Sequence, residues 1–281
     1  MTFPHYLQHW DKMGMARSVI FFSLFFSITA LLVLLYAFGF FQLVIAVLTA
    51  TTLVIVYLLF HPRNQWLVAN RSRVDGTRCV ALTFDDGPDP IDTPKLLDLL
   101  REKDVKATFF VIGKRADQYP EIVRRAWKEG HLIANHTWSH YSLFCFLLPR
   151  RLRAEIERCT ESIRRSSGSA PRFFRSPVGL RHPLLAPYLE NAGLEYVSWS
   201  IRTRDTFTAD SSVIARRILN KAASGDIILL HDSLPGGTSA MLEALPQVID
   251  DLRQRGFEFV LAGPREDAGG TLRPTACEPV S

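Results

Sequence analysis

Charged residues are absent from one long stretch of this sequence. From Ser18 to Phe60 there are 43 consecutive residues without Asp, Glu, Lys or Arg. At about 1.5 Å per residue, a helix of that length would extend roughly 65 Å, about twice the thickness of a hydrocarbon core of about 30 Å. The stretch therefore predicts two membrane-spanning helices, over 18–38 and 41–60.

A cleaved signal peptide is the alternative interpretation. It is disfavoured because the apolar region of a signal peptide is much shorter, and because no small-x-small cleavage site is followed by polar sequence. Lys12 and Arg17 precede the first span, arginines at 63, 71, 73 and 78 follow the second, and the connection at 39–42 is uncharged. The positive-inside rule then predicts a multi-pass protein of a bacterial-type inner (plasma) membrane with its catalytic domain in the cytoplasm.

Cysteine pairs and internal repeats are also absent. Cys79, Cys145, Cys159 and Cys277 form no Cys-x-x-Cys motif and show no disulfide-like spacing. Isolated thiols are typical of a reducing compartment, which agrees with the orientation that the arginines indicate. The net charge of +5 is compatible with a domain near anionic lipid, although it is also common in soluble proteins. No nucleic-acid partner is expected.

Five segments are expected along the chain. They are a basic N-terminal segment (1–17), two transmembrane helices (18–60), a linker (61–78), a catalytic domain (79–263) and a disordered tail (264–281). Within the domain, strands are expected at 79–84, 107–111, 131–134, 172–174, 195–199, 226–230 and 257–261. Helices are expected at 93–103, 119–129, 149–166, 183–192, 211–223 and 240–255. This alternation predicts a parallel α/β sheet, closed as a barrel or doubly wound.

Ionisable residues follow nearly every expected strand, and in parallel α/β barrels this is the catalytic edge of the sheet. Asp85 and Asp86 end the first strand, and His136 and His140 follow the third. On a helical turn, histidines four residues apart share a face and can bind one metal ion, whereas two ordinary surface histidines are the alternative. A carboxylate from Asp85 or Asp86 would complete a three-ligand site. The other carboxylate could then accept a proton from a water activated by the ion.

Two further residues could complete a hydrolytic site. His231 follows the apolar run 227–230 and could protonate a leaving group as an imidazolium. A histidine hydrogen-bonded at the edge of the core is the alternative. Arg175 could hold the basic carboxylate through a bidentate contact, and a surface arginine in a loop is the alternative.

The motifs "TFDDGPDP", "NHTWSH", "RSPVG" and "LLHD", in this order and at these separations, resemble those of the polysaccharide deacetylase family (NodB-like domains of carbohydrate esterase family 4). The resemblance covers roughly 75–262. It implies a distorted (β/α) barrel and metal-dependent removal of an N- or O-acyl group from a sugar. By the same resemblance, Asp85 is the general base, tethered by Arg175. The ligands of a divalent ion, zinc or a similar metal, are Asp86, His136 and His140.

The resemblance also makes His231 the general acid. Leu229 would line the pocket for the acyl methyl group, and the backbone N–H of Val178 would help to hold the oxyanion. The match is weaker at "WSIRTRDT", where the family has Asp-x-x-Asp-Trp. Asp205 is retained and could orient His231 and raise its pKa, but Arg202 replaces the first acid. An extra cation near the groove would suit an anionic substrate.

The segment after His140, "YSLFCFLLPRRLR", is apolar and then basic. One interpretation is a helix start packed on the barrel. The other is a membrane-contacting lip whose apolar side chains enter lipid while its arginines meet phosphates. The apolar side chains would be Leu143, Phe144, Phe146, Leu147 and Leu148, and the cations Arg150, Arg151 and Arg153.

The sequence thus predicts a membrane-anchored, metal-dependent carbohydrate deacetylase in contact with membrane lipid, whose amino-sugar substrate a polyprenyl phosphate could carry. An outward-facing deacetylase of peptidoglycan or an exopolysaccharide is the first alternative. An inactive sugar-binding or scaffold protein is an alternative of another class. The presence of a base, three metal ligands and an acid argues against that last interpretation.

Overall fold

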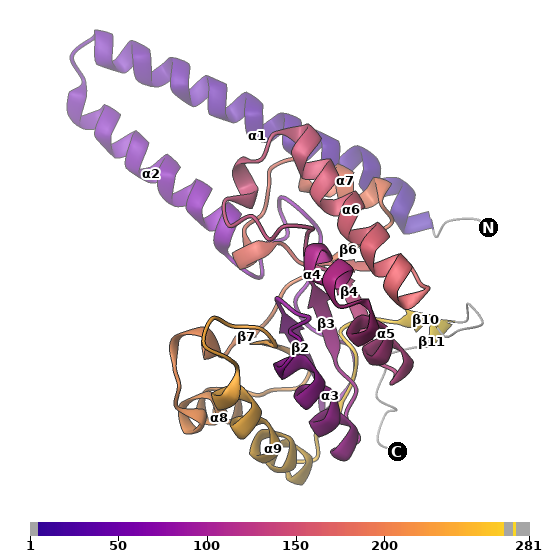
Figure 1. The fold of residues 1–281 in the computed structure, drawn as a ribbon. Coiled ribbons are helices and arrows are strands. Elements are labelled where there is room, and N and C mark those ends of the chain that lie inside the picture. Colours follow the sequence, from indigo (N-terminus) through magenta and orange to yellow (C-terminus); the bar gives the residue numbers. More distant parts are fainter. Residues whose placement is uncertain (1–4, 267–271, 274–281) are drawn as a thin grey trace.

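The computed structural model describes residues 5–266 and 272–273, and it consists of a helical hairpin and an α/β domain (Figure 1). The hairpin is formed by α1 (His5–Ala37) and α2 (Phe41–Phe60). Residues Ala16–Ala37 and Phe41–Phe60 are long and apolar enough to cross a membrane, and only 6% and 11% of their most apolar windows are buried. Low burial distinguishes these helices from the core helices of a soluble domain.

The α/β domain is built on a curled parallel sheet. Its strand order is β1-β6-β5-β4-β3-β2-β8-β7, and β9 also pairs with β2. All pairings between these strands are parallel. The strands are β1 (Asn70–Arg71), β2 (Cys79–Asp85), β3 (Thr108–Val111), β4 (Leu132–Asn135), β5 (Phe173–Phe174), β6 (Glu195–Val197), β7 (Ile201–Arg202), β8 (Asp226–His231) and β9 (Glu258–Phe259). The predicted distorted barrel is therefore confirmed, in the form of a half-barrel with β1 and β7 at its edges.

Helices cover the outside of this sheet. The α-helices are α3 (Asp92–Glu102), α4 (Gly113–Gln118), α5 (Pro120–Lys128), α6 (Pro149–Ser167), α7 (Leu185–Asn191), α8 (Ser211–Leu219) and α9 (Ser239–Gln254). Short 3-10 turns lie at η1 (Phe144–Phe146), η2 (Pro177–Gly179) and η3 (Asp205–Phe207). The central strand β2 is buried along its whole length, because helices cover one face and the inner core fills the other. This explains why β2 is a continuous apolar run without alternation.

The hairpin is fastened to the domain at its base. The Ser18 hydroxyl donates to the Pro183 carbonyl at 2.8 Å. Arg181, fully buried, donates from Nη1 to the His61 carbonyl at 2.6 Å and from Nη2 to the Pro62 carbonyl at 2.8 Å. The segment expected to be a linker also packs against the domain, since it contributes β1 to the edge of the sheet. The hairpin base and the loop after η2 therefore form one packed unit.

The cysteines differ from the sequence-based expectation. Cys145 and Cys159 are free and buried. Cys79 takes part in a disulfide, so the expectation of isolated thiols is wrong for this residue. Because disulfides persist mainly in oxidising compartments, the cysteines no longer favour the cytoplasm.

The tail expected to be disordered, 264–281, lies largely outside the described residues. Within it, β10 (Arg265–Glu266) pairs with β11 (Leu272–Arg273) in an antiparallel ladder.

Candidate metal and catalytic site

The parallel register brings the candidate residues to one edge of the sheet. Asp85, the last residue of β2, is directly opposite His231, the last residue of β8. His136 follows β4, two strands from β2 on the other side, and β3 lies between them. Side chains that are distant in sequence meet here because the C-terminal ends of parallel strands share an edge.

Asp86, His136 and His140 have the geometry of a metal site. Their ligand atoms all lie within 4.8 Å of one another. Asp86 Oδ1 is 3.1 Å from His140 Nε2 and 3.4 Å from His136 Nε2. Ligands about 2.0–2.1 Å from a tetrahedral ion lie about 3.3 Å apart, which agrees with these separations. Asp86 Oδ1 is also buried without a hydrogen-bond partner, so the three residues fit a divalent ion.

The loop that carries the two histidines is not the helical turn that their spacing predicted. Residues 136–140 are irregular, and both Thr137 (φ 67°) and His140 (φ 52°) adopt left-handed backbone conformations. Glu155 fixes the loop by accepting from the backbone N–H and the hydroxyl of Ser139, at 2.8 and 2.6 Å. The histidines therefore converge through a loop held by α6, and their side chains meet although the expected helix is absent.

The protonation states of the ligands follow from their surroundings. The His136 Nδ1–H donates to the Arg175 carbonyl at 2.8 Å, which leaves Nε2 directed at Asp86. Burial disfavours the charged form of Asp86, but the neighbouring His136 and then the charges of His140 and His231 outweigh burial and lower its pKa. Burial also lowers the pKa of His140. Burial acts in the same direction on His136, but there the charge of Asp85, followed by Asp86, outweighs burial and raises the pKa of His136. An ionised carboxylate and a neutral imidazole are the forms that bind metal, so binding of an ion would displace a proton from His136.

Asp85 is held by a buried arginine. Arg175 Nη1 donates to Asp85 Oδ1 at 2.6 Å and to the Thr83 hydroxyl at 2.9 Å, while Nη2 donates to the Ser198 carbonyl at 2.9 Å. The contact with the carboxylate is therefore single, and the bidentate geometry suggested by the sequence is wrong. Asp85 Oδ2 remains on the side of the metal ligands, 3.7 Å from His136 Nε2.

His231 forms an ion pair with Asp205. The His231 Nδ1–H donates to Asp205 Oδ1 at 3.0 Å, and the His231 backbone N–H donates to Asp205 Oδ2 at 2.8 Å. Burial lowers the pKa of His231, but the hydrogen bond and charge of Asp205, followed by the charges of Asp85 and Asp86, raise it to about 9. His231 is therefore an imidazolium at neutral pH.

Val178 and Leu229 flank these groups. Val178 has φ 58°, a left-handed conformation that is rare for a β-branched residue, and its side chain is half exposed. The neighbouring Gly179 is required, since its φ is 75° and a Cβ there would overlap Trp199. Leu229 is buried beside Trp199 in the inner core, two residues before His231 on the same face of β8. Their roles towards a substrate remain predictions.

Asp232 is a buried carboxyl group to which sequence reasoning assigned no role. The Thr93 hydroxyl donates to its Oδ2 at 2.7 Å, whereas its Oδ1 has no partner. Burial raises its pKa to about 7 against the opposing Thr93 hydrogen bond, and the charge of Asp86 adds to the rise. The signal in the sequence was its position directly after His231.

The apolar lip is only partly exposed. Phe144 and Leu147 are buried, so their expected insertion into lipid is wrong: they pack in a cluster beneath α6 and α7. Cys145 packs with Leu59 at the base of the hairpin. The exposed apolar side chains of this segment are Leu143, Phe146 and Leu148, at 53%, 74% and 76% exposure.

Comparisons with known proteins identify the family. Residues 72–197 match the polysaccharide deacetylase family model. The chain is 39% identical over 201 residues to a chitooligosaccharide deacetylase of Bradyrhizobium sp., covering 68% of this chain and 91% of that relative. It is 38% identical over 181 residues to a peptidoglycan-N-acetylglucosamine deacetylase of Bacillus cereus, covering 64% of this chain and 66% of that relative. The crystal structure of the Bc1960 peptidoglycan N-acetylglucosamine deacetylase is similar, with a TM-score of 0.65, 36% identity and coverage of 68% of this chain and 89% of that one. The chain therefore belongs to the polysaccharide deacetylase family and is a carbohydrate deacetylase, a hydrolase of amide bonds.

Proposed function

We propose that this protein removes an N-acetyl group from an amino sugar at a membrane surface, in a metal-dependent reaction. The observation that carries the proposal is the meeting of an arginine-held carboxylate, an Asp/His/His cluster and a charged histidine at one edge of the sheet. Relatives that act on N-acetylglucosamine units support the substrate class.

Asp86, His136 and His140 would hold the ion, and zinc is the first candidate because two histidines and one carboxylate are a common catalytic zinc set. Such an ion supplies Lewis acidity, which makes a water molecule more acidic and an amide carbonyl more electrophilic. Asp85 accepts the proton of the attacking water. Arg175 keeps one Asp85 oxygen occupied, so that the other faces the reaction.

His231 acts on the leaving group. An amine departs poorly as an anion, so the nitrogen must gain a proton as the bond to carbon breaks. The raised pKa of about 9 keeps His231 protonated and ready to donate. Asp205 positions the ring through Nδ1, which leaves Nε2 for the substrate. The Val178 N–H would hold the oxyanion, and Leu229 would contact the acetyl methyl group.

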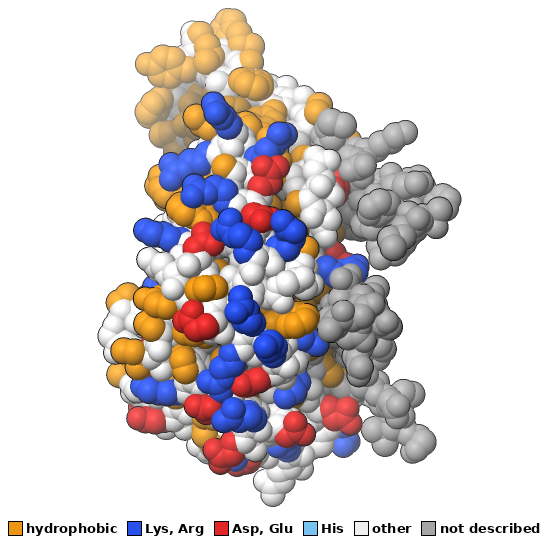
Figure 2. Space-filling model, turned by 45° about the vertical axis from the view of Figure 1, so that its right-hand side comes forward, with side chains coloured by type: hydrophobic (Ala, Val, Ile, Leu, Met, Phe, Trp, Pro, Cys, Tyr) orange, Lys and Arg blue, Asp and Glu red, His pale blue; other side chains and the backbone are white. Residues whose placement is uncertain are grey.

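The hairpin is proposed to span the membrane twice. Hydrophobic side chains gather on the hairpin at the top of Figure 2, and charged side chains, Lys and Arg with Asp and Glu among them, spread over the face beneath. This distribution is typical of a domain resting on a membrane surface. The exposed Leu143, Phe146 and Leu148 and the basic start of α6 would lie at the same interface.

The flanking arginines favour a catalytic domain on the cytoplasmic side, whereas the Cys79 disulfide favours the outer side. We propose the cytoplasmic side, because Arg17 and Arg63 lie next to the proposed spans and the hairpin connection is uncharged. A reporter fused after residue 264 tests this assignment. A reporter active only outside the cytoplasm would establish the outward-facing alternative.

Acetate release from chitin oligomers by the full chain tests the catalytic proposal. We expect release that depends on added metal and is abolished by chelation. Activity that survives full chelation, or an Asp85→Asn variant with undiminished turnover, would overturn the mechanism. An inactive wild-type protein that still binds the oligomer would support the sugar-binding alternative.

A lipid-carried amino sugar is the finer proposal for the substrate. It is supported by the hairpin and by the exposed apolar side chains that follow His140. Activity on a polyprenyl-phosphate-linked acetamido sugar, compared with a soluble chitin oligomer, tests it. Activity confined to the oligomer would exclude it.

A further inference from the structure

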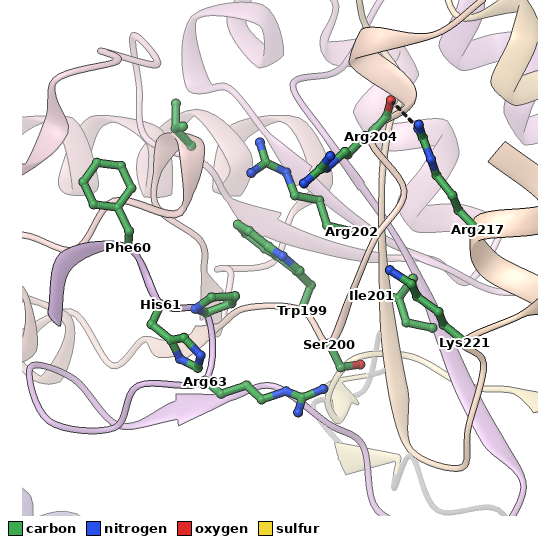
Figure 3. Close-up of a pocket in the computed structure, with 12 residues that line it drawn as sticks. Phe60, His61, Arg63, Trp199, Ser200, Ile201, Arg202, Arg204, Arg217 and Lys221 are labelled. Carbon is green, nitrogen blue, oxygen red and sulfur yellow. Dashed lines mark hydrogen bonds between the residues drawn. The ribbon is translucent and has the colours of Figure 1, made fainter. Parts of the chain in front are cut away.

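A basic pocket of about 670 Å³ lies between the end of α2 and the catalytic edge of the sheet (Figure 3). The hairpin contributes Phe60 and the three residues that follow it to the wall of the pocket. The domain contributes residues of the η2 loop, β7, the loop before η3, and α8. The pocket therefore lies between the proposed membrane boundary and the edge of the sheet that carries Val178 and Arg202.

The lining of this pocket is positively charged. None of its lining residues is acidic, and five of them are cations: Arg63, Arg202, Arg204, Arg217 and Lys221. Arg217 is used structurally, because its Nη1 donates to the carbonyls of Thr203 and Arg204 at 2.9 and 3.3 Å. The other four side chains are exposed to solvent. Concentrated cations without acidic neighbours repel one another and strongly attract an anion.

The pocket borders the proposed substrate site. Val178, proposed to hold the oxyanion, is part of its wall. Arg202 is in register with Leu229, two residues before His231. With about 4.8 Å between strands and about 3.3 Å of rise per residue, the Cα atoms of Arg202 and His231 are about 8 Å apart. A long arginine side chain can therefore contact a group on the sugar carbon next to the one that carries the acetamide.

We propose that this pocket binds the phosphate attached to the first carbon of a 2-acetamido sugar, and that the phosphate belongs to a lipid carrier. In such a glycosyl phosphate, the anion is one carbon from the carbon that bears the amide. Phe60 ends the apolar span, so a phosphate in the pocket lies where the headgroup of a membrane lipid would be. This inference rests on the proposed deacetylase function and adds the anchoring group of its substrate.

The test compares three substrates with the full chain in lipid vesicles. They are a polyprenyl-diphosphate-linked N-acetylhexosamine, a soluble N-acetylhexosamine 1-phosphate and a neutral chitin tetramer. Arg202→Gln and Lys221→Gln are made singly and together. Arg216→Gln is the matched control, because Arg216 is an exposed cation of the adjacent helix α8 that does not line the pocket. Hydrogen bonds to charged groups predict a loss in kcat/KM of roughly tenfold per cation and about 100-fold for the double variant on the phosphate substrates. The loss in kcat/KM on the tetramer should stay within about threefold. Added salt should likewise lower kcat/KM on the two phosphate substrates more than on the tetramer, because salt screens the attraction between the cations and the phosphate.

Each of the other outcomes contradicts one part of the proposal. Equal losses on all three substrates would show that the pocket has no anion site. A soluble sugar phosphate used as well as the lipid-linked one would remove the lipid carrier. If the wild type is inactive on every substrate, the deacetylase proposal fails, and the pocket is then tested alone by calorimetry. Binding of N-acetylhexosamine 1-phosphate to the metal-free protein should weaken in the double variant, and unchanged binding would refute the site.

Discussion

Replacing Asp205 with asparagine should disable the catalytic acid while leaving the fold intact. The carboxylate accepts two hydrogen bonds from His231, one from Nδ1 and one from the backbone N–H. An asparagine offers only one acceptor oxygen. If its carbonyl serves the backbone N–H, its amide N–H faces Nδ1, and the imidazole must be neutral to accept that hydrogen bond. The substitution therefore favours the deprotonated form of His231.

The magnitude follows from the pKa of His231. The rise from 6.5 to about 9 corresponds to about 3 kcal/mol in favour of the charged form, at about 1.4 kcal/mol per pH unit. Asp205 contributes the leading favourable interactions, and Asp85 and Asp86 contribute the rest. We expect Asp205→Asn to lower the pKa of His231 by about 1–2 units. Because the protonated acid is the active form, kcat/KM should fall as pH rises through the pKa of His231, and this fall should come at a lower pH in the variant than in the wild type.

The assay is acetate release against pH for an N-acetylated sugar and for an aryl acetate. The aryloxide leaves without a proton, so Asp205→Asn should lose far less activity on the aryl ester than on the amide. Asp210→Asn is the matched control: Asp210 caps α8 through Ser212 and Val213, and asparagine caps equally well. An alkaline limb at the same pH in Asp205→Asn and wild type, or equal losses on amide and aryl ester, would refute the role assigned to His231.

Three further predictions concern separate parts of the molecule. Asp86→Ala should lose metal and activity together, whereas Asp85→Asn should lose activity with its metal retained, as metal analysis after dialysis would measure. Similar behaviour of the two variants would contradict this division of roles. Gly179→Ala should lower the free energy of unfolding by about 1–3 kcal/mol in thermal melts, because its φ is 75° and a Cβ would overlap Trp199; an unchanged melting temperature would contradict the close packing. Phe146→Ser should weaken flotation of the protein with anionic vesicles without changing the melting temperature. Unaltered flotation would contradict the proposal that the exposed side chains after His140 contact lipid.

Much of the fold and of the site was predictable because the signals are local. Apolar runs bounded by Gly and Asp locate β2 and β8, and polar residues at their ends belong to the shared edge of a parallel sheet. The spacing of His136 and His140 correctly predicted that they share a site but gave the wrong backbone. Their convergence depends on left-handed residues and on Glu155 from another element, and neither leaves a periodic signal. Similarly, Arg175 makes one contact with Asp85 because backbone carbonyls from β6 and the following residue take its other donors.

One indication of the basic pocket was present in the sequence, namely Arg202 in place of an acid of the family pattern. Its other cations come from the segment after α2, from the loop before η3, from α8 and from the turn after α8, and the first of these is far from the others in the sequence. Such a cluster becomes visible only when the chain is folded. The partial burial of the lip has the same origin, since Phe144 and Leu147 face a cluster contributed by α6 and α7.

Arg181 makes the base of the hairpin part of the folding unit. Its buried guanidinium donates to the carbonyls of His61 and Pro62, which directly follow α2, so a domain cut after residue 62 would keep a buried cation without those acceptors. Breaking a buried charged interaction of this kind costs about 3–5 kcal/mol, a large part of the stability of a typical domain. Any segment that replaced the hairpin would therefore have to keep residues 61 and 62 in place, because the two acceptors of the Arg181 guanidinium belong to the junction and not to the helices.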